Sequence, residues 1–127
     1  GKVQYSDALE IMNNSDFILA MYYPYTSNHV YVSPNKSYEA LFLSTPIITS
    51  KGTLVGDKVA QTKTGYIVDD TLEGLHSLFA NVETEGFKHE YLVKCNNCAA
   101  QWKQVYADYK SKTMKGKYLD MIKSLVI

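Results

Sequence analysis

The stretch SPNKSYEALFLSTPIITS, residues 33–50, contains the signals for one helix followed by one strand. Pro34 and Asn35 favour a turn into a helix, and Pro46 cannot continue one, so the spacing predicts a helix over about residues 36–44. The apolar residues that follow in PIITS predict a short strand. A helix that leads directly into an apolar strand is typical of α/β proteins.

The residues on either side repeat this pattern. FILAMYY, residues 17–23, is a continuous apolar run that predicts a strand buried on both faces, and GYIV, residues 65–68, predicts another. Between Asp16 and Val82 the chain therefore alternates strand and helix three times. This order predicts a parallel, doubly wound α/β sheet with right-handed crossovers.

Three further helices are predicted, one before this part of the chain and two within it. Ser6 or Asp7 is expected to cap the first, and Asp70 with Glu73 has the spacing of a capping box for the third. The helices are expected to cover residues 7–13, 58–61 and 71–82.

The C-terminal part of the chain is predicted to be helical. From Phe87 to about Lys110 the apolar residues recur every three or four positions, which predicts one long amphipathic helix. A break near residues 114–116 precedes a last predicted helix, with Tyr118, Ile122, Leu125 and Val126 along one side. We expect one partial domain over 1–127, with an α/β part over 1–82 and C-terminal helices over 83–127.

Composition excludes several classes of function. Thirteen basic and thirteen acidic side chains cancel, which argues against a nucleic-acid binder that uses a broad basic surface and against a polybasic membrane anchor. No apolar run approaches the roughly 20 residues of a membrane span. We therefore expect a cytoplasmic protein.

Cys95 and Cys98 are the two cysteines of the chain. With His76 or His89 they supply part of a zinc ligand set, but their position on the apolar side of the long helix favours core packing. We expect core packing and no metal site.

The predicted helix start near Asn35 has the features of an anion site. Its first N–H groups lack helical partners and carry the positive end of the helix dipole, and Lys36 adds a full charge. Glu39 is expected in the same first turn, where its oxygens can accept hydrogen bonds from ribose hydroxyls. Acidic residues also favour first turns without binding anything. The pattern nevertheless predicts a nucleotide site.

Three motifs in order resemble a known family. YSDALEIMNNSDFILAMYYPY, SPNKSYEALFLSTPIITS and TGYIVDDTLEGL are similar to the later part of the C-terminal domain of GT-B glycosyltransferases of the group-one, family-four type. The resemblance covers about residues 1–82. It implies a partial Rossmann-like sheet of about three to four parallel strands that is flanked by helices and binds a nucleotide sugar.

The resemblance also implies roles for particular residues. Glu39 would bind the ribose of a UDP- or GDP-sugar, while Asn35, Lys36 and Ser37 would lie near the diphosphate. In the loop before them, His29, Tyr31 and Ser33 are candidates for contacts with the donor sugar. Tyr31 stands where many members have a second glutamate, and Ser44 stands where they commonly have glycine.

The implied reaction is retaining transfer of a sugar to an acceptor hydroxyl, in polysaccharide or glycolipid synthesis at the inner face of the membrane. It needs no cofactor or metal, and no catalytic residue is assigned. The strands and the acceptor-binding half that the family places earlier in the chain are missing, so we expect a fragment that is inactive alone. It is expected either to self-associate through the uncovered surface or to repack its C-terminal helices over it. A non-enzymatic α/β binding module and a GT-B-type nucleotide-sugar epimerase remain the alternatives.

Overall fold

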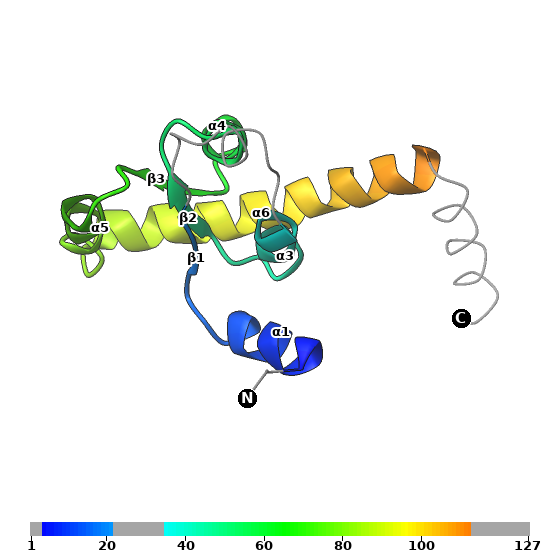
Figure 1. Cartoon of the computed structure of the whole chain (residues 1–127), viewed down its shortest axis with the longest axis horizontal. Coiled ribbons are helices and arrows are strands. Elements are labelled where there is room, and N and C mark those ends of the chain that lie inside the picture. The colour runs from blue at the N-terminus through cyan, green and yellow to red at the C-terminus, as the bar shows by residue number, and fades with distance from the viewer. Residues whose placement is uncertain (1–3, 22–34, 113–127) are drawn as a thin grey trace.

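A computed structural model describes residues 4–21 and 35–112 of the chain (Figure 1). The described elements are a three-stranded sheet and the helices around it. In chain order they are α1 (Tyr5–Asn13), β1 (Ile18–Ala20), α3 (Asn35–Phe42), β2 (Ile47–Ser50), α4 (Leu54–Thr62), β3 (Gly65–Val68), α5 (Leu72–Phe79) and α6 (Glu85–Lys112).

The sheet is parallel, with the strand order β1-β2-β3. Ile47 in the central strand pairs with Ile18 on one side and with Gly65 on the other. This confirms the predicted α/β class with a parallel sheet flanked by helices, an arrangement consistent with part of a Rossmann-like fold. A doubly wound sheet also requires a reversal of strand order, and the three described strands contain none.

One face of the sheet forms the core with α3 and α4. Along β1 the buried residues alternate with the exposed Leu19, whereas every residue of the central strand β2 is buried. On α4 the buried Val55 and Val59 recur at helical spacing. The buried cluster consists of Ile18, Ala20, Ala40, Ile47, Val55 and Val59, with Met12 and Leu43 packed against it.

Threonine caps explain two differences from the predicted helices. α4 begins at Leu54, four residues before the predicted start, because the Thr53 hydroxyl accepts a hydrogen bond from the Gly56 N–H at 3.0 Å. Likewise, Thr71 rather than Asp70 caps α5, since its hydroxyl accepts from the Gly74 N–H at 3.0 Å. The predicted Asp70 capping box is therefore wrong, and α5 ends at Phe79 rather than Val82.

The first helix also starts without its predicted cap. Ser6 and Asp7 lie inside α1, which follows Gln4, a residue that makes no side-chain capping bond. The long helix, in contrast, was predicted within two residues at each end. It begins at Glu85, after Thr84, whose hydroxyl accepts from the Phe87 N–H at 3.2 Å.

A serine with a left-handed backbone conformation follows the end of α3. Ser44 has φ of 54°, and the next N–H, that of Thr45, donates to the Ala40 carbonyl at 3.0 Å. Glycine is the usual residue at such a position because it adopts positive φ without strain. The helix predicted over 36–44 therefore ends two residues earlier, at Phe42, and Ser44 then adopts the conformation that glycine would otherwise supply.

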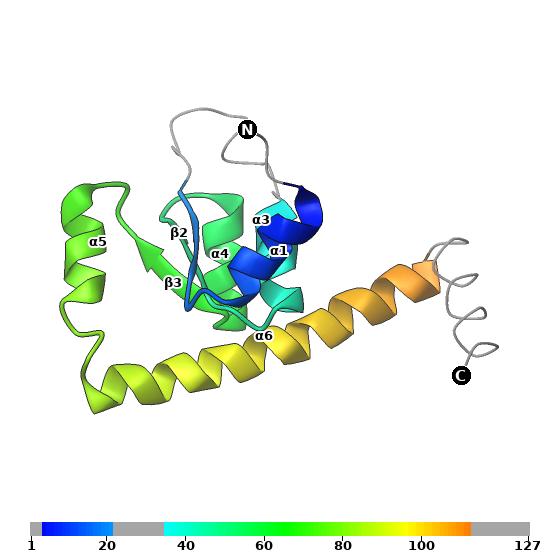
Figure 2. The same ribbon diagram turned by 90° about the horizontal axis from the view of Figure 1, so that it is seen from below.

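The long helix α6 crosses the amino ends of the strands (Figure 2). The Tyr91 hydroxyl donates to the Asp16 carbonyl, just before β1, at 2.7 Å. The Cys98 thiol contacts the Thr64 carbonyl, just before β3, at 3.3 Å. Through these contacts to the segments that lead into β1 and β3, α6 closes the amino edge of the sheet.

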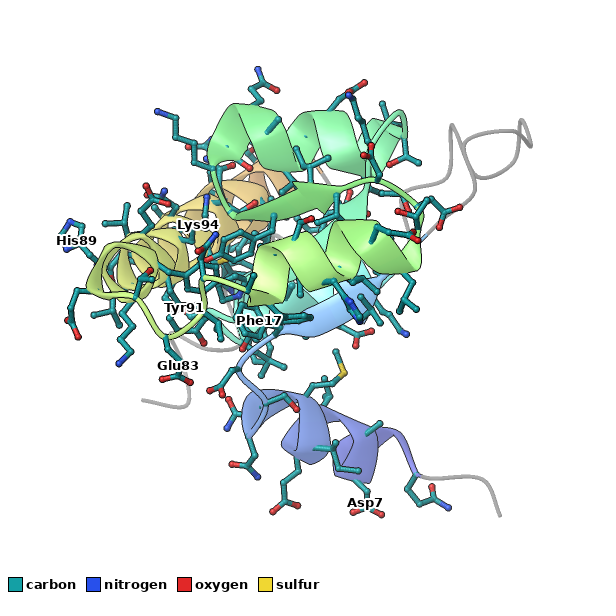
Figure 3. The ribbon with its side chains drawn as sticks, turned by 90° about the vertical axis from the view of Figure 1, so that its left-hand side faces the viewer. Asp7, Phe17, Glu83, His89, Tyr91 and Lys94 are labelled. Atoms are coloured by element: carbon teal, nitrogen blue, oxygen red, sulfur yellow. The ribbon has the colours of Figure 1, made fainter. Side chains whose placement is uncertain are left out.

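An aromatic cluster reinforces this closure. Phe17, just before β1, lies edge-on to four other rings at centroid distances of 5.4 to 6.3 Å. Figure 3 shows Phe17 and Tyr91 pointing toward one another between the sheet and α6. The rings around Phe17 are those of Tyr66, Phe79, Phe87 and Tyr91.

Among the helices in the described ranges, none combines the length and the apolar character that a membrane crossing requires.

Candidate functional site

The candidate site lies at the carboxyl edge of the sheet. Because the strands are parallel and each one is followed by a helix, α3, α4 and α5 all begin at this edge, opposite the one that α6 closes. In open parallel sheets, ligands bind beyond the carboxyl ends of strands, where helix N-termini meet loops. The three helix starts are therefore the places to compare.

The first turns of these helices differ in charge. α4 has Asp57 in its first turn and α5 has Glu73, whereas α3 has no acidic residue there and carries Lys36 as its second residue. A carboxylate at a helix start competes with a bound anion for the same positive dipole end, while a lysine adds to it. Of the three, α3 is electrostatically the best suited to a phosphate.

Glu39 does not lie in the first turn, contrary to the prediction. α3 begins at Asn35, so Glu39 is its fifth residue and stands at the start of the second turn. Lys36 is exposed, and Glu39 is half-buried. Neither side chain forms a hydrogen bond or an ion pair with another described residue.

The rotation of the helix separates the predicted site residues into two groups. At about 100° per residue, Lys36 and Glu39 project roughly 60° apart and share one side of α3, whereas Ser37 and Glu39 project roughly 160° apart. Ser37 lines a cavity toward α4, and Glu39 does not. Lys36 and Glu39 therefore lie on the same side of α3, and Ser37 lies on a different side. Asn35 begins the helix.

Three further predicted residues lie outside the described part of the chain. His29, Tyr31 and Ser33, the candidates for donor-sugar contacts, belong to the segment between β1 and α3. Their contacts stay a prediction.

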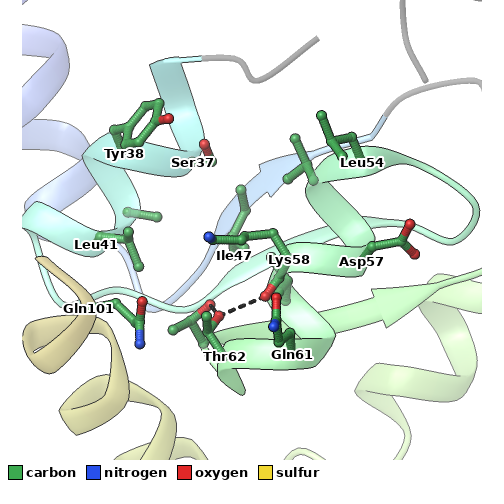
Figure 4. Close-up of a pocket in the computed structure, with 14 residues that line it drawn as sticks. Ser37, Tyr38, Leu41, Ile47, Leu54, Asp57, Lys58, Gln61, Thr62 and Gln101 are labelled. Carbon is green, nitrogen blue, oxygen red and sulfur yellow. Dashed lines mark hydrogen bonds between the residues drawn. The ribbon is translucent and has the colours of Figure 1, made fainter. Parts of the chain in front are cut away.

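A cavity of about 350 Å³ lies between α3, α4 and α6 (Figure 4). Its floor is apolar and includes Ile47 and Val55, while polar side chains surround its opening. The Thr62 hydroxyl, which also lines the cavity, donates to the Lys58 carbonyl within α4 at 2.8 Å. The polar side chains on the rim are Ser37, Asp57, Lys58, Gln61 and Gln101.

Sequence reasoning missed every rim residue of this cavity except Ser37. Lys58 and Gln61 come from α4, and Gln101 comes from α6. No local motif marks these side chains, because they meet only when α3, α4 and the middle of α6 pack together.

A second, shallower groove of about 720 Å³ separates α4 from α5 at the carboxyl edge. Lys51 is the basic residue along it, and Asp57, Asp69 and Glu73 are the acidic ones. The capping threonines Thr53 and Thr71 already bind one N–H in each helix. The excess of carboxylates makes this groove a poor phosphate site.

The strongly shifted pKa values lie at the opposite, amino edge. Burial raises the pKa of Tyr66 to about 12, with smaller contributions from Glu90 and Cys95. Burial also raises the pKa of Cys98 to about 12 and, less strongly, that of Cys95. The pKa of Tyr91 is raised well above its usual range, again mainly by burial. These groups stay neutral at physiological pH and serve packing.

The structure places one of the two cysteines in the core, as predicted. Cys98 is fully buried beneath β3, and Cys95 is half-buried. Within the described ranges, no three histidine, cysteine or carboxylate side chains are grouped so that they could hold a metal ion.

Comparisons with known proteins do not identify a family for this chain. No family model matches the chain, and neither a curated protein nor a solved structure is significantly similar to it.

Proposed function

We propose that this chain is the donor-binding part of a GT-B-type retaining glycosyltransferase that uses a UDP- or GDP-sugar. The diphosphate would lie against the start of α3, and the ribose hydroxyls would bind the Glu39 carboxylate one turn further along. The observation that carries the proposal is the charge of the helix starts. α3 combines Lys36 with an acid-free first turn, and Glu39 is on the same side.

The proposed chemistry is electrostatic. When a nucleotide sugar reacts, negative charge develops on the leaving diphosphate, and preorganised N–H groups and cations stabilise it. The N–H groups of the first turn of α3 and the ammonium group of Lys36 would supply this stabilisation. Glu39 would act as a hydrogen-bond acceptor for the ribose and take no part in bond making.

The geometry within α3 supports this division of roles. Residues three apart on a helix are neighbours, with Cβ atoms about 5–6 Å apart. A diphosphate at Lys36 and a ribose at Glu39 are adjacent groups of one nucleotide, so their order along the helix matches their order in the ligand. Ser37, which projects into the cavity toward α4, is assigned no side-chain contact with the nucleotide.

Nucleotide titration with variants of the two charges tests the proposal. Binding of UDP, GDP and inorganic pyrophosphate would be measured by NMR shift perturbation. Glu39→Gln should weaken nucleoside diphosphate binding about tenfold, because a charge-assisted hydrogen bond contributes about 1.5–3 kcal/mol. It should leave pyrophosphate binding unchanged, whereas Lys36→Ala should weaken binding of both ligands, most strongly at low salt.

A matched control is available at the same edge. Glu73→Gln removes one carboxylate from the start of α5, where no nucleotide is proposed, and should leave all three affinities unchanged. If wild type binds no nucleotide, or if Glu73→Gln and Glu39→Gln weaken binding equally, the donor-site proposal is wrong. The first of these results would favour a non-enzymatic binding module.

A further inference from the structure

The cavity between α3, α4 and α6 has no role in the proposed nucleotide site, because neither Lys36 nor Glu39 lines it. Its volume of about 350 Å³ lies at the lower end of the range of about 300–1,000 Å³ that is usual for ligand pockets. Its construction is also usual for such pockets, since an apolar floor is combined with a few polar groups on the rim. The cavity therefore suits a small ligand.

The floor of the cavity is fixed by the core of the fold. Ile47, Val55 and Val59 line it, and each of them is at most 4% exposed. Because these side chains are held by close packing within the core, the floor does not depend on a ligand for its shape. At the mouth, in contrast, Tyr38 and Leu54 are both 44% exposed. A ligand with an apolar body would remove part of this surface from water, which is favourable.

The charge at the mouth is positive on the side that faces the cavity. Lys58 is the basic residue among the described residues that line it, and its ammonium group forms no ion pair or hydrogen bond with any of them. In Figure 4 the Lys58 side chain reaches from α4 across the cavity toward α3, whereas Asp57 points away from it. Asp57 also lines the groove between α4 and α5. An anionic group at the mouth would find a charged donor in Lys58.

A neutral donor stands on the same rim. The Gln101 side chain comes from α6, is half-buried and forms no hydrogen bond with a described residue. Its amide N–H groups can donate to an anion without adding charge. One ammonium group with a neutral amide matches the single charge of a carboxylate better than the charge of about −1.5 to −2 that a phosphate monoester carries.

We propose that this cavity binds a small monocarboxylic acid with an aliphatic or aromatic body. The body lies on the floor formed by Ile47, Val55 and Val59, and the carboxylate accepts hydrogen bonds from Lys58 and Gln101. The inference does not rest on the proposed nucleotide site, because the two sites share no side chain.

Three probes separate the contributions of the carboxylate and the apolar body. Hexanoate, 1-hexanol and acetate would be titrated into the full-length chain and followed by NMR. Hexanoate should shift the methyl signals of Val55 and Val59 and bind about tenfold more tightly than 1-hexanol, which lacks the charged group. Acetate, which has the same charge and almost no apolar body, should bind more weakly than hexanoate.

A lysine variant with a matched control tests the assignment of the donor. Lys58→Gln should weaken hexanoate binding about tenfold and leave 1-hexanol binding unchanged. This change should not threaten folding, because the side chain is exposed. Lys103→Gln removes the same charge from an exposed position on α6 outside the cavity and should leave both affinities unchanged.

Three results would overturn the proposal. These are unshifted Val55 and Val59 signals with hexanoate, equal affinities for hexanoate and 1-hexanol, and equal weakening of hexanoate binding in Lys58→Gln and Lys103→Gln. Lys36→Ala separates this proposal from that of the nucleotide site, since it should weaken nucleotide binding and leave hexanoate binding unchanged.

Discussion

The two edges of the small parallel sheet are built in opposite ways. At the amino edge, α6 seals the strand starts with hydrogen bonds from Tyr91 and Cys98 and with the rings around Phe17. At the carboxyl edge, three helices begin, and Lys36 and Asp57 in their first turns are exposed. The difference indicates that the amino edge stabilises the fold, and the carboxyl edge is the one at which we propose a ligand.

The largest effect is expected where the strands approach most closely at the amino edge. A side chain at Gly65 would collide with the carbonyl oxygen and the side chain of its strand partner Ile47. Because the Ile47 backbone can shift only at a high cost in energy, Gly65→Ala should lower the free energy of unfolding by about 3 kcal/mol. Urea denaturation would measure this loss.

The control for that substitution is another glycine on the amino-edge side. Gly86, in the first turn of α6, has open space around the position of a Cβ atom. Gly86→Ala should raise stability by about 0.5–1 kcal/mol, since alanine loses less backbone entropy in a helix. Equal losses in the two variants would contradict the close approach at Gly65.

The aromatic cluster supplies the next largest test. Phe17→Ala removes the ring that contacts four others and should cost about 3 kcal/mol of unfolding free energy. Leu54→Ala truncates a 44% exposed side chain at the carboxyl edge and should change stability by about 0.5 kcal/mol or less. Equal losses of unfolding free energy in the two variants would contradict the view that the amino edge stabilises the fold more than the carboxyl edge does.

Alkaline pH should weaken the amino edge. The pKa values of Cys98 and Tyr66 in the folded chain are both about 12, above the ordinary values of 9.0 and 10.0. The unfolded chain therefore loses these protons first, and stability falls as the pH rises from about 9 toward 12. Urea midpoints between pH 8 and 11.5 would follow this decline.

A stability that stays constant over this range would show that the raised pKa values are absent. Cys98→Ala removes the more strongly shifted thiol and should make the decline near pH 9 shallower, leaving the contribution of Cys95 there and that of the tyrosines nearer pH 10.

The smallest test compares two hydroxyl groups within the amino edge. Tyr91→Phe should lose about 1 kcal/mol, because its hydroxyl donates to the Asp16 carbonyl. Tyr66→Phe should instead gain up to about 1 kcal/mol, because the buried Tyr66 hydroxyl has no hydrogen-bond partner among the described residues. The same denaturation assay applies, and changes of equal sign would contradict this assignment of partners.

Much of the fold was predictable because its signals are local. The predicted strand GYIV matches β3 at both ends, and α3 ends within two residues of the predicted end at Ser44. Helix starts were predicted less well. At α5 the cap is Thr71, one residue after the predicted Asp70, and at α4 it is Thr53, where no cap was predicted.

By itself, the sequence determined the order of elements, the parallel α/β class and the charged residues at the start of α3. These features follow from apolar periodicity, prolines and turn residues, which act within a few positions. Only the tertiary structure decided that α6 covers the amino edge, that Cys98 is buried beneath β3 and that Ser37 and Glu39 project to different sides of α3. Such features depend on which faces pack together, and residues far apart in the chain jointly set that packing.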